Sequence, residues 1–352
     1  MSSAFPQGTP DGATPPDGAT PPASALRPAP TPGSLPPAFQ SSTPPPPEPP
    51  RPGFLWRLGG VVKTLRPHQW FKNTFVLAPV FFAKDIFRVE LLVRAASAFA
   101  VFCLLAGAVY TMNDLVDVEG DRAHPVKRRR PIPSGRVPLP LAKAVTAALV
   151  TLSLAASVAL GPGFAAAAFG YFGLNVAYSL RLKKIAYFDV MCIAAGFVLR
   201  VVAGGLATGV KVSDYLLVCT ALLALFLGFG KRRHELAQAL AGSATKQRAA
   251  LDAYSPRALT AALSLTCAAT LGVYTLYTLD PTTKAFFHND LLWPTVIFPV
   301  VGMGRFLYLV THRPKAESPT QEMLRDVPFI LNLIAWVLAV LWLLYQLRPG
   351  VG

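Results

Sequence analysis

Long apolar segments alternate with short polar segments along most of the chain. From Leu91 onward, runs of about 20 residues with few internal charges recur, and that length crosses the hydrocarbon core of a bilayer as an α-helix. We therefore expect an all-α, polytopic membrane protein with about nine transmembrane helices. The predicted spans cover residues 73–87, 91–112, 139–160, 164–180, 188–208, 215–230, 258–279, 291–310 and 327–347.

The first segment, residues 1–53, has a different composition. It is rich in proline, together with Gly, Ser, Thr and Ala, and it has few of the aliphatic residues that a core needs. It also lacks the basic start and the continuous apolar run of a secretory signal peptide. We predict a disordered cytoplasmic tail, followed by one transmembrane domain at residues 54–352. The sequence does not identify a binding partner of the tail.

The composition of the whole chain agrees with a membrane protein. Of the 352 residues, 53% are hydrophobic and 14% are charged, and the net charge is +15. Soluble domains of this size rarely have such values, so a single soluble core is excluded. The positive charge is spread over the loops that flank the apolar segments, and nucleic-acid binding is therefore not expected.

The charges of the connections predict the orientation in the membrane. The connections at residues 161–163, 209–211 and 280–290 carry little positive charge, whereas the others are strongly basic. The basic connections are the segment before Asn73 and residues 121–136, 181–184, 231–257 and 312–315. Because an excess of Lys and Arg marks cytoplasmic loops, we assign these to the cytoplasmic face of the membrane.

A cluster of carboxylates follows the span at residues 91–112. Asp114, Asp117 and Asp121 are spaced i, i+3 and i+7, which places them on one helix face, and Asn113 lies beside them. Like charges so close together repel, and a hard cation with oxygen ligands would relieve that repulsion. Mg²⁺ typically binds one or two carboxylates plus phosphate oxygens. A solvated acidic helix end is the alternative.

A dense basic run follows the carboxylates at once, at His124-Pro125-Val126-Lys127-Arg128-Arg129-Arg130-Pro131. A basic run alone is often only an anchor at the cytoplasmic face. Acidic and basic residues within one loop instead fit a metal-bridged polyphosphate, whose charge must be met from both sides. The sequence thus predicts a magnesium-bound diphosphate at the cytoplasmic end of this helix.

Three motifs stand in order along the chain: Arg66-Pro67-x-x-Trp70-x-Lys72-Asn73, then Asn113-Asp114-x-x-Asp117-x-x-x-Asp121-Arg122, then Arg130-Pro131-x-x-x-Gly135. Together they resemble the UbiA superfamily of intramembrane prenyltransferases, over about residues 65–347. The resemblance implies a UbiA-type helix bundle with a cytoplasm-facing cavity and a Mg²⁺-dependent transferase.

The loop after residues 215–230 departs from the aromatic prenyltransferases of that superfamily. Those enzymes carry a second aspartate-rich motif there, whereas this chain has Lys231-Arg232-Arg233-His234-Glu235-Leu236. One acidic motif with extra cations suits a donor that carries more phosphate groups than a prenyl diphosphate does, such as phosphoribosyl diphosphate.

Further motifs resemble the decaprenyl-phosphate phosphoribosyltransferase branch of the superfamily. They are Tyr178-Ser179-x-x-Leu182-Lys183, Gly196-Phe197-x-Leu199-Arg200 with Gly204-Gly205, Lys231-Arg232-x-x-Glu235-Leu236, and Ser318-Pro319-Thr320 with Leu324-Arg325-Asp326. That branch implies transfer of 5-phosphoribose from phosphoribosyl diphosphate to a polyprenyl phosphate, with release of diphosphate.

Particular residues receive roles from this hypothesis. The expected metal and diphosphate ligands are Asn113, Asp114, Asp117 and Asp121, and the expected donor contacts are Lys127, Arg130, Tyr178, Lys183, Lys231 and Arg232. Arg66 and Lys72 lie where a lipid phosphate would enter, although Lys72 could equally be an interfacial anchor. Arg200 lies inside an apolar span, where an unpaired charge is costly, so it should grip the lipid phosphate or pair with Asp189.

Two other functions stay open at this point. An aromatic prenyltransferase with a prenyl diphosphate donor would need aspartates at residues 231–257, where only Asp252 stands. A transporter would need inverted repeats or broken helices at the midplane, whereas the polar residues here gather at one face. The sequence also leaves open a homo-oligomer and the prenyl chain length of the acceptor.

Overall fold

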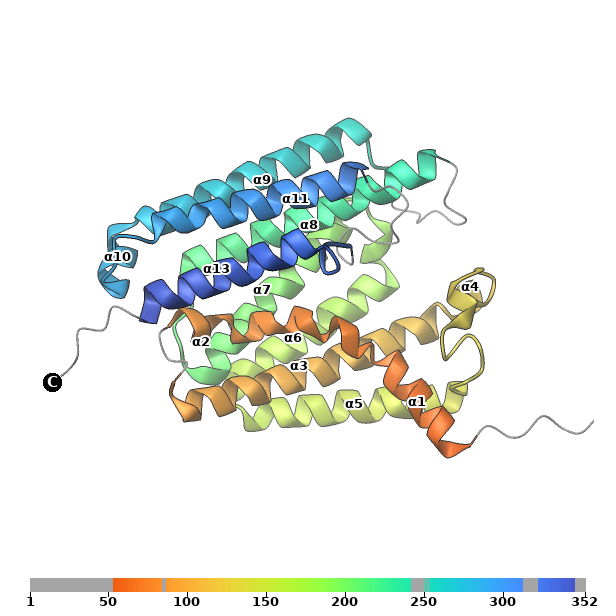
Figure 1. The fold of residues 1–352 in the computed structure, drawn as a ribbon. Helices are drawn as coiled ribbons and strands as arrows, with labels where there is room; N and C mark the ends of the chain where they lie inside the picture. The colour runs from red at the N-terminus through yellow and green to blue at the C-terminus, as the bar shows by residue number, and fades with distance from the viewer. Residues whose placement is uncertain (1–52, 84–86, 242–250, 252, 313–321, 346–352) are drawn as a thin grey trace, which may run out of the picture. The chain divides into compact units, whose positions relative to one another are not determined.

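The computed structural model describes residues 53–83, 87–241, 251, 253–312 and 322–345, and these residues contain helices but no strands (Figure 1). The expected tail at residues 1–53 lies outside them except for Gly53. The helices are α1 (Phe54–Thr64), η2 (Pro67–Leu77), α2 (Ala78–Phe82), α3 (Val89–Val116), α4 (Val118–Arg122), η3 (Lys127–Arg129), α5 (Leu139–Ala159), α6 (Pro162–Leu180), η4 (Leu182–Lys184), α7 (Phe188–Thr208), α8 (Asp214–Leu240), α9 (Pro256–Leu279), α10 (Pro281–Phe287), η6 (Trp293–Val296), α11 (Ile297–His312) and α13 (Val327–Tyr345).

Seven helical segments of the described residues are long and apolar enough to cross a membrane, and each coincides with a predicted span. They are α3, α5, α7, α8, α9, the segment Trp293–His312 and α13. The all-α membrane fold is therefore confirmed, whereas the count of nine is not. The fourth predicted span does form α6, a helix of 19 residues, but α6 is not among the seven.

The first predicted span, residues 73–87, is wrong as a continuous α-helix. The chain instead forms the 3₁₀-helix η2 and then the short helix α2. Pro79 is the second residue of α2. Proline has no backbone N–H, so Pro79 cannot donate to the carbonyl of Phe75 as an unbroken α-helix would require. An 11-residue 3₁₀-helix is also unusually long, since such runs rarely exceed about four residues.

Consecutive helices pack as neighbours in the bundle (Figure 1). α3 packs on α5, α5 on α6, α6 on α7, α7 on α8, and α8 on α9, while α11 packs on α13. One buried apolar cluster joins α3, α6 and α7, and a second joins α8, α9 and α11. Large apolar side chains such as Leu265 and Leu331 are exposed on the outer surface of the spans, as expected where lipid replaces water.

The segment η2 lies against both α3 and α7, and one glycine permits the contact with α7. A Cβ atom at Gly204 would lie 1.9 Å from the carbonyl oxygen of Val76, which is far inside van der Waals contact. Small residues let transmembrane backbones approach closely. The Gly204 contact therefore sets how deeply η2 lies in the bundle.

Replacing Gly204 with Ala should destabilise the protein by about 1–3 kcal/mol or more, because the added methyl group must push η2 off α7. Gly173→Ala on α6 is the matched control, since a Cβ there meets nothing within 4 Å. Thermal unfolding of both variants in detergent measures the difference. Equal stability of the two variants would show that η2 is not held by this contact.

Candidate functional site

The acidic cluster lies at one end of α3, where the helix breaks. Asp114 is in its last turn, Asp117 stands at the break with φ −94°, and Asp121 belongs to α4. Backbone hydrogen bonds from Asp117 N to Asn113 O (3.0 Å) and from Asp121 N to Asp117 O (2.8 Å) preserve the helical spacing across the break. Asp114 and Asp121 are buried, whereas Asp117 is half-exposed.

Two arginines, one before the cluster in the chain and one after it, neutralise the buried carboxylates. Arg66 Nη2 lies 2.5 Å from Asp114 Oδ1. Arg130 Nη1 lies 3.1 Å from Asp114 Oδ1 and 2.7 Å from Asp121 Oδ2, so one nitrogen bridges both side chains. Lys127 Nζ is 3.9 Å from Asp121 Oδ1. The structure thus brings together the first three sequence motifs at one place.

The end of α6 and the turn η4 reach the same cluster. Lys183 Nζ lies 2.9 Å and 3.1 Å from the two carboxylate oxygens of Asp117. The Ser179 hydroxyl hydrogen-bonds the Asn113 side-chain oxygen, and Tyr178 lies beside it on α6. Ser179 stood in a quoted motif but received no role from the sequence, because a serine hydroxyl carries no charge that marks it.

The donor atoms of the cluster suit a hard cation, although the three aspartates do not converge. Among the described residues, no three His, Cys, Asp or Glu side chains are arranged to hold a metal ion. Asp114 and Asp121 nevertheless lie within bonding distance of one guanidinium nitrogen, so a single cation can bridge them. One or two carboxylates plus phosphate oxygens are the usual Mg²⁺ set, and Asn113, Asp114 and Asp121 fit it. Asp117 instead faces Lys183.

A second group of cations lies next to this cluster. Lys72, on η2, is half-buried and lies outside the seven candidate spans. Burial, followed by the positive charges of Lys231, Arg200 and Arg66, lowers the pKa of the Lys72 ammonium to about 8. Lys231 Nζ is also 4.0 Å from Glu235 Oε1. Cations from η2, α7 and α8 therefore converge near the end of the cluster that Arg66 occupies.

Arg200 is buried within α7, but it does not pair with Asp189, so that alternative is wrong. Its Nε donates to Asn73 Oδ1 (2.8 Å), Nη1 to the Gly196 carbonyl (2.9 Å) and Nη2 to the Tyr171 hydroxyl (2.8 Å). The guanidinium also lies over the Tyr171 ring, 4.6 Å from its centroid. Every one of these partners is neutral.

Arg232 pairs with Asp189 instead, inside the protein. Arg232 Nε lies 2.8 Å from Asp189 Oδ2, and the two side chains are 1% and 0% exposed. Arg232 also contacts Glu235. A side chain enclosed in this way does not reach a donor phosphate, so the expected role of Arg232 as a donor contact is not supported. Its position instead ties α8 to α7.

Tyr254 extends the same buried pair to the segment before α9. Its hydroxyl donates to Asp189 Oδ1 and accepts from the Tyr187 backbone N–H (2.7 Å). Burial, together with the hydrogen bond to Asp189, raises the pKa of the Tyr254 phenol, which keeps the donated proton in place. Tyr187 has a positive φ of 67° directly before α7, so this bond holds a strained turn.

The last sequence motif has a structural role where it is described. Ser318, Pro319 and Thr320 lie outside the described residues. Asp326 forms a two-pronged pair with Arg305, with nitrogen-to-oxygen distances of 2.9 Å and 2.8 Å. The pair joins α11 to the start of α13.

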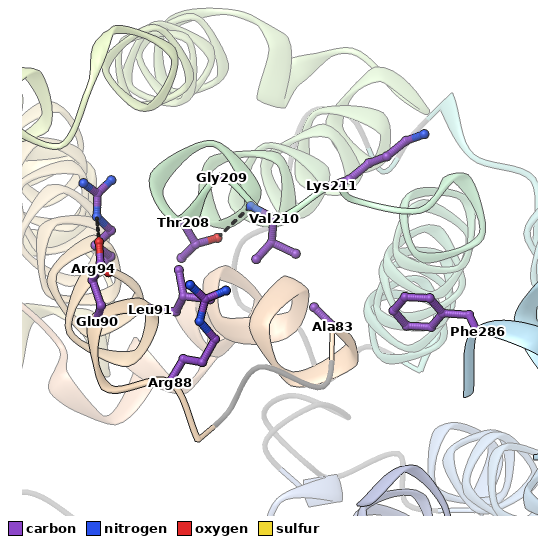
Figure 2. A pocket seen from close by; sticks show the side chains of 10 residues that line it. All are labelled: Ala83, Arg88, Glu90, Leu91, Arg94, Thr208, Gly209, Val210, Lys211 and Phe286. Carbon is purple, nitrogen blue, oxygen red and sulfur yellow. Dashed lines mark hydrogen bonds and ion pairs between the residues drawn. The ribbon is translucent and has the colours of Figure 1, made fainter. Parts of the chain in front are cut away.

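A cavity of about 620 Å³ lies at the other end of α3, away from the acidic cluster (Figure 2). Arg88, Arg94, Thr208, Lys211 and Phe286 are among the residues that line it. Asp114 stands 25 residues after Val89, the first residue of α3, which is about 37 Å along a helix axis. None of the predicted site residues lines this cavity.

Fold and site together define a class of protein: a helical integral membrane protein with a cluster of carboxylates and cations at one end of α3. The chain belongs to the UbiA prenyltransferase family, whose model matches residues 74–319. Members of this family are enzymes, and the resemblance expected from the motifs is confirmed.

Relatives with assigned names agree over most of their length. The chain is 38% identical over 290 residues to a decaprenyl-phosphate phosphoribosyltransferase of Corynebacterium glutamicum, covering 81% of this chain and 87% of that protein. A protein of the same name from Mycobacterium tuberculosis is 37% identical, with 80% and 93% covered.

Solved structures show the same fold at low identity. A UbiA homolog from Archaeoglobus fulgidus bound to DMAPP and Mg²⁺ superimposes with a TM-score of 0.60 at 19% identity, covering 82% of this chain and all of that one. A digeranylgeranylglyceryl phosphate synthase superimposes with a TM-score of 0.58 at 16% identity, covering 83% of this chain and 99% of that one.

The Arg232 pair can be tested through stability. Arg232→Gln should destabilise the protein by about 3–5 kcal/mol, because it leaves Asp189 charged and buried without a partner. The double variant Asp189→Asn with Arg232→Gln should recover part of that loss. Thermal unfolding in detergent measures both.

Arg233→Gln is the matched control, since Arg233 donates to Thr260 at an exposed position. Its effect should stay within about 0.5 kcal/mol. If Arg232→Gln kept wild-type stability and weakened binding of an anionic donor, Arg232 would be a substrate contact after all.

Proposed function

We propose that this protein transfers 5-phosphoribose from phosphoribosyl diphosphate to a polyprenyl phosphate, with Mg²⁺ and with release of diphosphate. The observation that carries the proposal is the surplus of cations around one acidic motif. Arg66, Lys127, Arg130 and Lys183 all pair with Asp114, Asp117 or Asp121. The names of the relatives at 37–38% identity support the same reaction.

The donor would be held at the end of α3. Asn113, Asp114 and Asp121 carry the oxygens for the metal. Asp117 could join them once the Lys183 side chain leaves Asp117 and binds a phosphate of the donor. Mg²⁺ bound there supplies positive charge to the departing diphosphate. Arg130 and Lys127, which now neutralise the carboxylates, are placed to bind the phosphate oxygens of the donor.

The reaction requires little acid or base catalysis by the protein. A phosphate oxygen of the lipid attacks the anomeric carbon, the bond from that carbon to the diphosphate oxygen breaks, and the electron pair leaves with the diphosphate. The transition state resembles an oxocarbenium ion, by analogy with glycosyl transfer. A phosphate monoester is already largely ionised at neutral pH, so no strong base is needed. Catalysis then rests on positioning and on charge stabilisation.

The rival donor, a prenyl diphosphate, would require a second acidic motif in the protein. The described end of α8 carries one early carboxylate, Glu235, which contacts Arg232 and Lys231. Asp252 lies outside the described residues. A membrane transporter is disfavoured because the chain belongs to a family of enzymes.

The orientation also belongs to this proposal. Multiple apolar helices make the chain an integral membrane protein. The basic segments at residues 121–136 and 181–184 lie at the same end of the bundle as the acidic cluster, and positive loops face the cytoplasm. We therefore place the site at the cytoplasmic face of a bacterial cell membrane.

Purified protein in detergent should convert labelled phosphoribosyl diphosphate and a polyprenyl phosphate to a labelled lipid, and chelation of Mg²⁺ should stop the reaction. Asp117→Asn should lower the rate by about 10²–10³-fold, as for loss of one preorganised charge partner. Chromatography of the extracted lipid measures the product.

Glu119→Gln serves as the control for this variant. Glu119 is an exposed carboxylate on α4, two residues from Asp117, and the change should leave the rate within about twofold of wild type. Product made instead from a prenyl diphosphate and an aromatic acid would contradict the proposed phosphoribosyl transfer.

A further inference from the structure

The cations near the site fall into two sets that differ in their partners. Arg66, Lys127, Arg130 and Lys183 pair with the aspartates of the cluster. Lys72 and Arg200 form no ion pair within the described part of the chain. Lys72 Nζ donates a long hydrogen bond to the neutral Gln69 Oε1, at 3.4 Å. No carboxylate of the described residues therefore balances the charge of the second set.

Arg200 shows the imbalance most clearly because it is buried. Phe188 begins α7, and Arg200 stands 12 residues later, about 18 Å along the helix axis. Three hydrogen bonds to Asn73, Gly196 and Tyr171 fix the direction of the guanidinium without neutralising it. Charges inside membrane helices pair with other charges or mark a substrate path. Arg200 thus contributes an oriented positive charge to the interior.

Lys72, on η2, adds to the positive charge that Arg200 contributes. Its pKa is lowered by burial and by Lys231, Arg200 and Arg66, which means that these positive charges act on one another. Like charges in a low-dielectric setting repel strongly. An anion bound among them would relieve the repulsion and would be bound tightly for the same reason.

The surroundings favour a lipid anion over the water-soluble donor. Phe75 of η2 packs edge-on against Phe197 of α7, with ring centroids 5.0 Å apart, and Arg200 lies over the same Phe197 ring at 5.3 Å. The positive charge thus borders aromatic surface between the two elements, whereas Lys127 and Asp117 of the donor site are about half-exposed. A phosphate on a prenyl chain can meet both the charge and the aromatic surface.

One residue connects the two sets. Arg66 stands directly before η2, pairs with Asp114, and acts on the charge of Lys72. A phosphate at Lys72 would therefore lie next to the place where the diphosphate leaves. That is the arrangement a nucleophilic phosphate requires, since reaction depends on near contact of the reacting atoms.

We infer that Lys72, supported by Arg200, binds the phosphate monoester of the lipid acceptor, whereas the cations paired with the aspartates serve the donor. This assignment rests on the proposed function. In this assignment Lys72 contacts the substrate. Arg200 is a positioning residue, because its hydrogen bond to Asn73 holds η2.

Lys72→Met should raise the KM for polyprenyl phosphate about 10- to 100-fold and leave the KM for phosphoribosyl diphosphate within about twofold, because one charge-assisted hydrogen bond to the acceptor is lost. Lys63→Met is the matched control, since Lys63 is exposed on α1, and it should leave both constants unchanged. A rise in the KM for the donor alone would assign Lys72 to the ribose 5-phosphate and overturn the inference.

A binding measurement separates this inference from the reaction itself. Decaprenyl phosphate, but not decaprenol, should raise the unfolding temperature of the wild type in detergent, and the rise should vanish in Lys72→Met. Equal rises in the wild type and in Lys72→Met would refute the site while leaving the proposed function intact. A wild type that binds the lipid but transfers nothing would refute the function and leave the site intact.

The pH dependence gives a readout that a purely structural role would not move. The Lys72 ammonium is present below its pKa of about 8 and is lost above it, so kcat/KM for the lipid should fall as the pH rises through about 8. The charged groups that face Lys72 are Arg66, Arg200 and Lys231, and His68 lies on the same segment.

Lys72→Arg should keep the charge and extend the plateau of kcat/KM to higher pH, because arginine stays protonated. kcat/KM for the donor should not share the fall near pH 8. An unchanged profile in Lys72→Arg would show that another group titrates and would overturn the role of Lys72.

Discussion

Charge balance at the broken end of α3 is the constraint on which the rest of the structure depends. Asp114 and Asp121 are buried and close enough to share one nitrogen of Arg130. Two ionised carboxylates in such a place are stable only beside cations, so the chain must bring Arg66 and Arg130 there from either side. The helix bundle is arranged to make this meeting possible: η2 lies on α3 and α7, and the loop after α4 folds back over the carboxylates.

The same residue types have two separate uses in this protein, and burial distinguishes them. Asp189 and Arg232 form a pair that is almost wholly enclosed, which Tyr254 completes, and it fastens α7, α8 and the segment before α9. The pairs at Asp117 and Asp121 involve side chains that remain partly open to solvent. An enclosed pair stays as it is, because opening it would strand a charge, whereas a partly open pair can exchange its partner for a phosphate oxygen.

Much of the fold and part of the site could be predicted from the sequence. Apolar runs predicted seven of the spans, because hydrocarbon thickness sets their length, although α8 continues ten residues beyond its predicted end, to Leu240. The sequence also placed the carboxylates and the basic run of one loop around a common phosphate, but it did not predict the direct pair of Asp121 with Arg130. Position could not separate Arg232 from Lys231, its neighbour, since which of two adjacent basic residues turns inward depends on Asp189, 43 residues earlier. The break in the first span likewise could not be predicted from Pro79 alone. It also depends on the contact at Gly204, which lies 125 residues later in the sequence.

The irregular backbone of η2 connects the fold to the chemistry. A regular α-helix from Asn73 onward would turn its side chains at 3.6 residues per turn, whereas a 3₁₀-helix places residues i and i+3 on one line. Gln69 and Lys72 are so related, and their side chains approach each other. Arg66, at φ 51°, takes a left-handed conformation that costs a non-glycine residue about 1–2 kcal/mol. Strain of this kind persists where surrounding contacts hold it, and here the Asp114 pair, the Gly204 contact and the Arg200 bond to Asn73 all do so. The segment that presents both Arg66 and Lys72 is therefore shaped by the bundle around it, and the site exists only in the folded membrane domain.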